Sequence, residues 1–193
     1  MNRRNRKAMT PTKSCNSLVA LFCVVLLTLA FALSSSIKAQ DNPNSYKLNE
    51  AGIQFTVPSD WDVQKGPDGT TIVAKKENDA VVVFSLIVLP RPPNVSLTLE
   101  TNFAAFSQGA LDSLKKDWKD FKADDPGKDS QNGMNLMVQS FKGSLPDSGD
   151  MEGLVIVFDS PKPIGILAIR TKKHSDALEK ESTSWLKSIR KIE

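Results

Sequence analysis

The single histidine of this sequence, His174, is followed directly by Ser175 and Asp176, so the three side-chain types of a hydrolytic triad stand together. A histidine can act as a general base near neutral pH. Triad members converge in space from separate parts of a chain, however, so neighbouring positions are no evidence for a triad, and no nucleophile-elbow sequence is present. The ordinary interpretation is a solvated helix start after Lys172 and Lys173. A small extracytoplasmic hydrolase or ligand-binding enzyme that uses His174 is the alternative.

A second group with potential chemistry consists of Asp124, Asp125 and Asp129, because carboxylate oxygens are ligands for calcium. The EF-hand pattern requires a glycine at its sixth position and a glutamate at its twelfth. Counted from Asp124, those positions hold Asp129 and Asn135, so the pattern fails. We expect a solvated loop at 124–133 with these aspartates as weak metal candidates, and we predict neither a metal site nor a cofactor.

The other motifs of known enzymes are missing from this sequence. It contains no phosphate loop and no glycine motif for dinucleotides. Both cysteines, Cys15 and Cys23, lie near the N-terminus, which leaves the remainder without a thiol nucleophile or an internal disulfide. The sequence therefore predicts a protein without catalytic residues.

Two features indicate binding to a protein partner whose identity the sequence does not give. Arg91, Pro92 and Pro93 follow an apolar strand, and a proline-stiffened loop with an arginine can form a preorganised contact surface. The alternative is a plain strand terminator. Trp61 could stack on a ligand, although most tryptophans are largely buried, which makes a core position the alternative.

The first forty residues carry the features of a secretory signal peptide. A basic start without acids precedes the uncharged stretch 17–33, and a small residue, Ala39, offers a cleavage point. We predict a signal peptide at 1–39, a polar linker at 40–45 and one domain at 46–193. The apolar stretch is close to the length of about 20 residues that spans a membrane, so a retained anchor facing outside the cytoplasm is the alternative to a periplasmic or secreted protein.

Removing this leader changes the charge of the chain. The leader carries six of the 25 basic residues and none of the 22 acidic ones, so 19 basic residues face 22 acidic ones and the remainder has a net charge of −3. This composition gives no argument for a nucleic-acid partner. Contact with a membrane is expected only if the N-terminal segment is retained.

The pattern of the predicted domain alternates between strands and amphipathic helices. Apolar residues at every second position predict a half-buried strand at 53–57, and the almost wholly apolar stretch 80–89 predicts a central strand covered on both faces. Apolar spacings of three and four predict a helix at 97–122 and another from His174 onward. Further strands are predicted at 70–76, 134–145, 153–158 and 164–171. Short turns between strands favour an antiparallel sheet, which makes this an α+β domain: a central, mostly antiparallel sheet flanked by helices in an α/β/α sandwich.

This order resembles the PsbP-like superfamily, which includes the PsbP subunits of photosystem II and bacterial periplasmic DcrB-type proteins. The resemblance is carried by the stretch from Gly52 to Pro58 that leads to Trp61, by the turn 66–69, and by the closing helix that ends near Ile189. It spans most of residues 46–193 and rests on structural motifs. It implies the same sandwich and a protein that binds or assists partners in the cell envelope without catalysis. We expect it to act through its surface loops, near residues 90–93 and 124–133.

Overall fold

The computed structural model describes residues 44–66, 69–90 and 97–193. The predicted signal peptide lies outside these residues, as do Arg91, Pro92 and Pro93. In chain order the elements are β1 (Ser45–Leu48), the 3₁₀ turn η1 (Asn49–Ala51), β2 (Ile53–Thr56), β3 (Asp62–Lys65), β4 (Thr71–Glu77), β5 (Ala80–Val88), α2 (Leu99–Asp117), β6 (Lys119–Ala123), β7 (Gly127–Gln131), β8 (Met134–Leu145), β9 (Gly149–Phe158), β10 (Ile164–Thr171), α3 (Asp176–Ser188) and β11 (Arg190–Lys191). Among the described residues, no helix is long and apolar enough to cross a membrane.

The main sheet runs in the order β3-β4-β5-β10-β9-β8-β6, and β7 pairs with the other half of β8. A smaller sheet has the order β1-β2-β11. Every recorded pairing in both sheets is antiparallel, which confirms the predicted sheet type. The one non-local step in the centre, β5 against β10, joins the N-terminal hairpins to the C-terminal ones.

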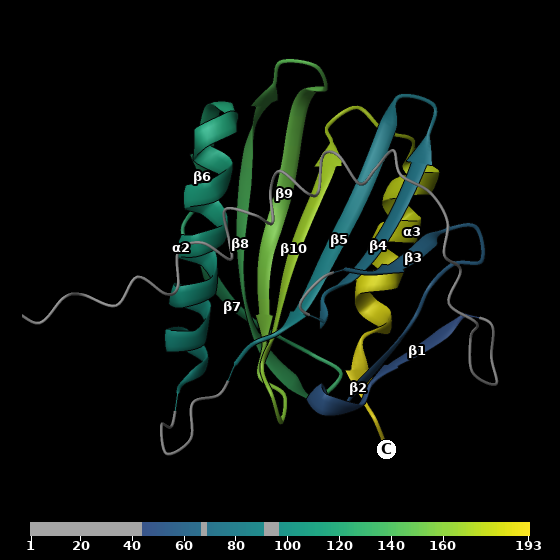
Figure 1. Cartoon of the computed structure of the whole chain (residues 1–193), viewed down its shortest axis with the longest axis vertical. Coiled ribbons are helices and arrows are strands. Elements are labelled where there is room, and N and C mark those ends of the chain that lie inside the picture. Colours follow the sequence, from purple (N-terminus) through teal and green to yellow (C-terminus); the bar gives the residue numbers. More distant parts are fainter. Residues whose placement is uncertain (1–43, 67–68, 91–96) are drawn as a thin grey trace, which may run out of the picture. The chain divides into compact units, whose positions relative to one another are not determined.

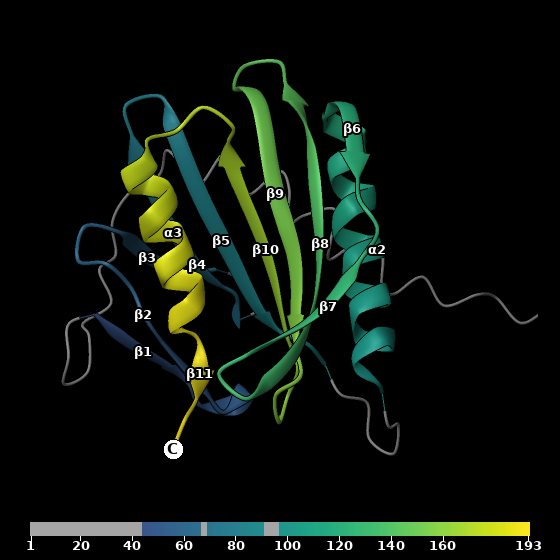
Figure 2. The same cartoon turned by 180° about the vertical axis from the view of Figure 1, so that it is seen from behind.

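In the described part of the chain, the helices α2 and α3 cover opposite faces of the main sheet, and each covers only part of its face (Figures 1 and 2). Successive residues of a strand point to opposite faces. A side chain at Gly165 would meet the ring of Phe106 from α2, whereas its neighbours Ile164 and Ile166 join the core beneath Trp185 from α3. The domain is therefore an α+β sandwich of the predicted α/β/α kind.

The largest core lies between α3 and the sheet and is centred on aromatic rings. Trp185 is 1% exposed, and its ring stacks on that of Phe84 with 4.1 Å between centroids. The edge of Phe55 meets the same indole at 5.8 Å, and Phe84 stacks on Trp61 at 6.0 Å. These rings fix α3 and the small sheet against β4 and β5, because offset and edge-on aromatic pairs add to the gain from burial.

Pro58 follows the end of β2 and begins the turn that leads to Trp61. β2 buries Ile53 and Phe55, and pairing with β1 ends at Thr56, two residues before Pro58. A tight turn follows, with the amide of Trp61 donating to the carbonyl of Pro58 at 3.1 Å. The turn returns Trp61 to the core, where it is 6% exposed.

The prediction for residues 97–133 was wrong in two places. The helix ends at Asp117 instead of continuing to residue 122, and the expected loop at 124–133 contains the edge strand β7. Trp118 leaves the helix in extended conformation (φ −97°, ψ 133°) and packs against Phe121 and Phe141, with centroid distances of 6.1 and 5.6 Å. Packing against β8 therefore outweighs the helical spacing of these aromatic residues.

Central strand β5 is also less covered than predicted. Its side chains Val81, Val83 and Ile87 are half-buried, because α2 lies over β8 and β9 on that face. The alternate residues Val82, Phe84 and Leu86 point toward α3 and are buried. On the α3 side β5 is therefore more completely buried, and only Val88 at its end is half-buried there.

The turn of the β7–β8 hairpin caps the C-terminal end of α3 through side-chain hydrogen bonds. Asn132 and Gly133 form its two-residue turn, both with positive φ (49° and 72°), which is the geometry that suits an Asn-Gly pair. The Asn132 amide donates to the carbonyls of Lys187 and Ile189 at 2.9 and 2.8 Å. The Gln131 amide donates to those of Leu186 and Ile189 at 2.8 and 3.3 Å. Two side chains thus supply donors to carbonyls that a helix leaves unpaired.

We expect Asn132→Gly to lower the free energy of unfolding by about 1–2 kcal/mol, because it removes two hydrogen bonds and keeps a residue that tolerates positive φ. Urea denaturation would measure the loss. Asn78→Gly is the matched control, since Asn78 also has positive φ (54°) in a hairpin turn and caps no recorded carbonyl of α3. An equal effect of the two substitutions would contradict the capping role.

Candidate functional site

His174 lies at the start of α3 and contacts backbone and carboxylate groups. Its Nδ1 is 2.9 Å from the carbonyl oxygen of Thr171, which can only accept, so Nδ1 carries the hydrogen. Its Nε2 is 3.7 Å from a carboxylate oxygen of Glu179. The Ser175 hydroxyl instead accepts from the amide of Leu178 at 3.1 Å and donates to Glu77 at 2.9 Å, as an N-cap. The arrangement is that of a helix start and not of a histidine that activates a serine.

The three aspartates named as metal candidates occupy separate places along the edge of the sheet. The Asp124 carboxylate accepts a hydrogen bond from the Ser140 hydroxyl. Asp125 is exposed, and Asp129 lies in β7, where its carboxylate accepts from the amide of Ser130 at 2.7 Å. Among the described residues, no three histidine, cysteine, aspartate or glutamate side chains are grouped so that they could hold a metal ion.

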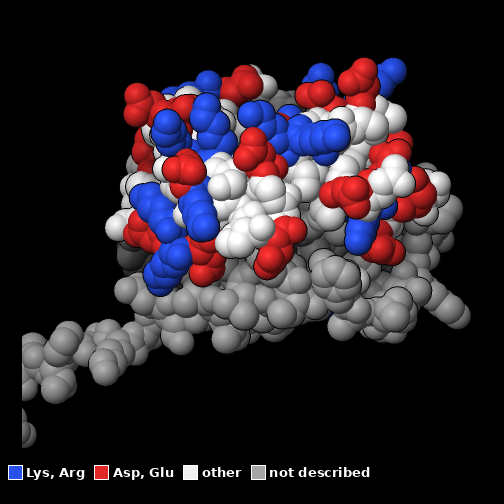
Figure 3. All heavy atoms as spheres, turned by 90° about the horizontal axis from the view of Figure 1, so that it is seen from above, with Lys and Arg blue, Asp and Glu red and all other residues white. Residues whose placement is uncertain are grey.

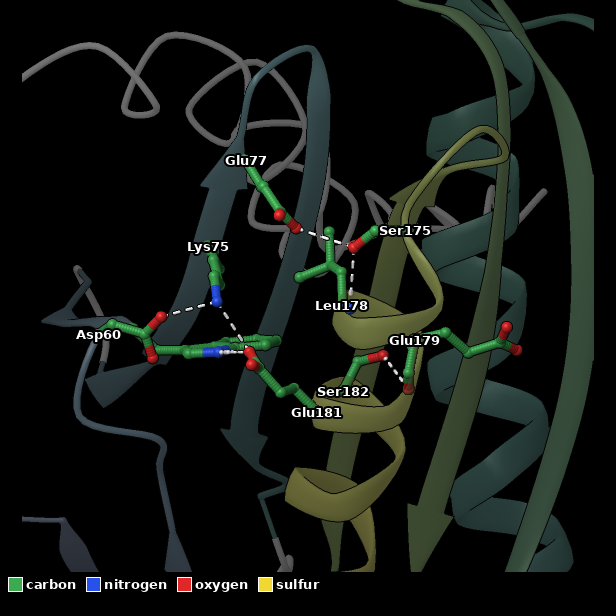
Figure 4. Close-up of polar contacts among 9 residues, drawn as sticks. Asp60, Lys75, Glu77, Ser175, Leu178, Glu179, Glu181 and Ser182 are labelled. Atoms are coloured by element: carbon green, nitrogen blue, oxygen red, sulfur yellow. Dashed lines mark hydrogen bonds and ion pairs between the residues drawn. The ribbon is translucent and has the colours of Figure 1, made fainter.

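Trp61, the predicted stacking residue, takes part in a partly exposed polar network that links β4 to α3. Figure 4 shows Asp60, Lys75 and Glu181 of this network. Its indole N–H donates to Glu181 at 3.0 Å. The ammonium group of Lys75 lies between two carboxylates, 2.8 Å from Glu181 and 2.7 Å from Asp60. The ring of Trp61 therefore packs in the core on Phe84, and its polar atom is engaged inside the protein.

The same network shifts three pKa values. Hydrogen bonds from Lys75 hold the pKa of Asp60 and that of Glu181 below their ordinary values, and the indole of Trp61 adds to the effect on Glu181. The hydrogen bonds to Asp60 and Glu181 raise the pKa of Lys75 to about 12. The carboxylates stabilise the fold above their unfolded pKa values, and this contribution is lost as the pH falls through the lower folded values. The contribution of Lys75 is lost only as the pH rises through about 12.

We expect Glu181→Gln to flatten the loss of stability on acidification, because glutamine can still accept from Trp61 but has no proton to take up. Urea midpoints of the two proteins at a series of pH values from neutral to about pH 3 would measure this effect. Asp125→Asn, which alters an exposed carboxylate, is the control. Parallel curves for wild type and Glu181→Gln would contradict the role of the network.

A groove of about 430 Å³ beside α3 combines apolar and charged side chains. We call it the α3 groove. Its floor is formed by Phe84, Leu154 and Ala168 on β5, β9 and β10, and its wall by Thr183 and Leu186 on α3. Phe84 and Ala168 are buried, whereas Leu154 and Leu186 are only half-buried. Apolar surface therefore stays open where α3 ends its cover of the sheet.

Four charged side chains, one on each of four neighbouring strands, stand opposite one another in register and form a row beside this floor. Lys122 on β6 pairs in register with Lys142 on β8, Lys142 with Glu152 on β9, and Glu152 with Arg170 on β10. Paired residues share a face of the sheet, so the row lies on the α3 side. The next row holds Ser140, Leu154 and Ala168, which places the charges directly beside the floor.

Arg170 is the most constrained member of the row. Its Nε and one terminal nitrogen lie 2.8 and 2.7 Å from the same oxygen of Glu152, and that nitrogen is 3.6 Å from Glu179 on α3. The guanidinium group therefore ties the groove's wall to its floor.

On the end of the domain that carries the β4–β5 and β8–β9 turns, basic and acidic side chains are interspersed (Figure 3).

Sequence reasoning missed this groove. Its residues come from five elements, and Leu154, Ser140 and Arg170 read individually as ordinary strand residues. One signal was present: Lys142, Glu152 and Arg170 stand two residues from Ser140, Leu154 and Ala168 on their strands, so charged side chains fall on a face that also carries apolar ones.

No family model matches this sequence, and a search of curated proteins finds no relative. Solved structures do match. The solution structure of cyanobacterial PsbP (CyanoP) from Synechocystis sp. PCC 6803 is 13% identical, covers 81% of this chain and 98% of its own, and has a TM-score of 0.54. LpqN, involved in cell envelope biogenesis of Mycobacterium tuberculosis, is 12% identical with a TM-score of 0.42, over 78% of this chain and 86% of its own. The protein PA94 from Pseudomonas aeruginosa is 15% identical with a TM-score of 0.41, over 72% and 92%. The likeness to CyanoP confirms the PsbP-like fold that the sequence predicted.

Proposed function

We propose that this PsbP-like chain is an exported, non-enzymatic binding or accessory protein of the cell envelope that holds a protein partner in the α3 groove. The observation that carries the proposal is the open apolar surface of the groove, where Leu154 of the floor and Leu186 of the wall remain half-buried beside side chains that are almost completely enclosed. Apolar surface bordered by polar groups is typical of interaction sites. The signal peptide predicted at 1–39 supports export.

The groove replaces the loops at 90–93 and 124–133 as the place where we expect contact. Most of the first loop lies outside the described residues, and the second contains strand β7. Asp124 is the one member of the second loop that borders the groove. The contacts of His174 with Thr171 and Glu179 give no specific support to the alternative of a hydrolase.

Photo-crosslinking from one helix tests the proposal. Thr183 lines the groove, and the next residue, Ser184, is also exposed but does not. A photoreactive amino acid at each position would be activated in cells that export the full chain. We expect a discrete crosslinked protein from Thr183 and none from Ser184. Loss of the Thr183 product in a Leu154→Arg variant, whose side chain fills the groove, is the second expected result.

Ile87→Arg is the matched control for that substitution, because Ile87 is also half-buried but lies on the opposite face of the sheet. It should leave the crosslink intact. Equal crosslinking from Thr183 and Ser184, or an effect of Ile87→Arg as large as that of Leu154→Arg, would count against the groove. Urea denaturation of each variant would establish that it is folded.

A further inference from the structure

The charged row beside the α3 groove is not evenly neutralised. At one end, Arg170 has Glu152 within 2.7 Å and Glu179 within 3.6 Å. At the other end, Lys122 and Lys142 are both exposed, and neither has a recorded carboxylate within 4 Å among the described residues. The positive charge of the row is therefore concentrated where β6 meets β8.

The two lysines are direct cross-strand partners in an antiparallel pair. Like charges placed directly opposite each other destabilise a sheet, and a carboxylate bound between them would remove that repulsion. The nearest acid of the next row, Asp124, is engaged by the Ser140 hydroxyl, and Glu152 is engaged by Arg170. Both neighbouring carboxylates thus have partners other than the lysines.

The apolar floor begins one row away from this pair. Leu154 stands beside Glu152 on β9 with one residue between them, and Leu186 faces it from α3. A ligand that reaches the floor with an apolar group therefore brings its neighbouring group to the lysines. The floor is small and open, which suits one or two side chains of a peptide better than the long chain of a lipid.

We infer that the α3 groove binds a peptide segment of a partner protein in which an apolar side chain stands next to an acidic one, with the apolar group on Leu154 and Leu186 and the carboxylate between Lys122 and Lys142. This inference rests on the proposed function and specifies the partner's chemistry. At the other end of the row, Glu152 already neutralises Arg170, so an acidic side chain of the segment finds no free positive charge there. The acidic side of the bound segment therefore lies toward Lys122 and Lys142.

Fluorescence anisotropy with a defined set of peptides tests the inference. The probes are labelled eight-residue peptides with a central leucine pair flanked by glutamate, by glutamine or by lysine. We expect the glutamate-flanked peptide to bind most tightly to the full chain. The double substitution Lys122→Glu and Lys142→Glu should weaken it by about tenfold or more and should favour the lysine-flanked peptide instead. Lys116→Glu with Lys180→Glu changes the charge equally at exposed positions outside the groove and should leave binding unchanged.

Four outcomes would overturn the inference, and a fifth would overturn the proposed function. Equal binding of all peptides would remove the role of the carboxylate, as would equal effects of the two double substitutions. Binding to phosphatidylglycerol vesicles that depends on Lys122 and Lys142, without binding of the acidic peptide, would assign the lysines to a lipid surface. If the crosslink from Thr183 persists in the Lys122→Glu, Lys142→Glu variant, the inference about the acidic side chain fails and the groove remains the binding site. If Thr183 gives no crosslink in the wild-type chain, the proposed function itself fails.

Discussion

Replacing Trp185 with alanine is expected to lower the free energy of unfolding by about 3–5 kcal/mol, the range found when a large buried aromatic side chain is removed. Trp185 is 1% exposed and joins three layers, since its ring stacks on Phe84 of β5 and meets Phe55 of β2. Its removal leaves a cavity between helix and sheet that rigid strands cannot close. Urea or thermal denaturation followed by circular dichroism would measure the loss.

Two further substitutions show whether the loss comes from the apolar ring of Trp185, from its N–H group, or from any substitution at this place on α3. Among the described residues, the indole N–H of Trp185 has no hydrogen-bond partner, so Trp185→Phe should cost far less than Trp185→Ala. Leu186→Ala changes the next residue of α3, which is half-buried, and should also cost less. A Trp185→Ala variant no less stable than Leu186→Ala would show that α3 does not pack as described.

Gly153→Ala is expected to be the most damaging small substitution, with a loss of about 3 kcal/mol in the free energy of unfolding. A Cβ at this position would lie 2.2 Å from the carbonyl oxygen of Ala168 and 2.4 Å from the ring of Phe141. The ring can rotate away, but the carbonyl belongs to the neighbouring strand β10 and cannot move without disturbing the ladder between β9 and β10. The glycine therefore allows the close approach of the two central strands.

Gly127→Ala is the control for this prediction. Gly127 lies in edge strand β7, and a Cβ there would meet nothing within 4 Å. Its substitution should leave the urea midpoint almost unchanged or raise it slightly, since alanine reduces the freedom of the unfolded chain. Equal stabilities of Gly153→Ala and Gly127→Ala would contradict the strand packing.

The strands and helices that the sequence predicted correctly are those whose buried residues recur with the period of a strand or of a helix. β8 and β10 were predicted at their observed bounds, because turn residues stand directly before each strand and turn or charged residues directly after it. The strands β6 and β7 were missed because they are an edge: β7 is almost wholly exposed, and its sequence of charges and small residues protects the edge from further pairing. The Asn132-Gly133 turn was the signal that could have revealed the β7–β8 hairpin.

The groove could not be predicted in the same way, since it depends on where α3 ends its cover of the sheet. The amphipathic stripe of α3 was predicted, but its lateral position over β5 is set by tertiary contacts such as the stacking of Trp185 on Phe84. The exposed part of β9 follows from that position. Trp61 shows the converse: its core location was one of two open interpretations, and its exposed fraction of 6% agrees with that location.

The accessibility of Leu154 tests the open groove most directly. Both cysteines of the chain lie at positions 15 and 23, so a Cys15→Ser, Cys23→Ser background allows single cysteines to be labelled without interference. Leu154→Cys and Val155→Cys are neighbours on β9 that point to opposite faces, and Val155 is 0% exposed. We predict rapid reaction of a soluble maleimide with Leu154→Cys and protection of Val155→Cys. Equally slow labelling of both in the folded protein would contradict an open groove beside α3.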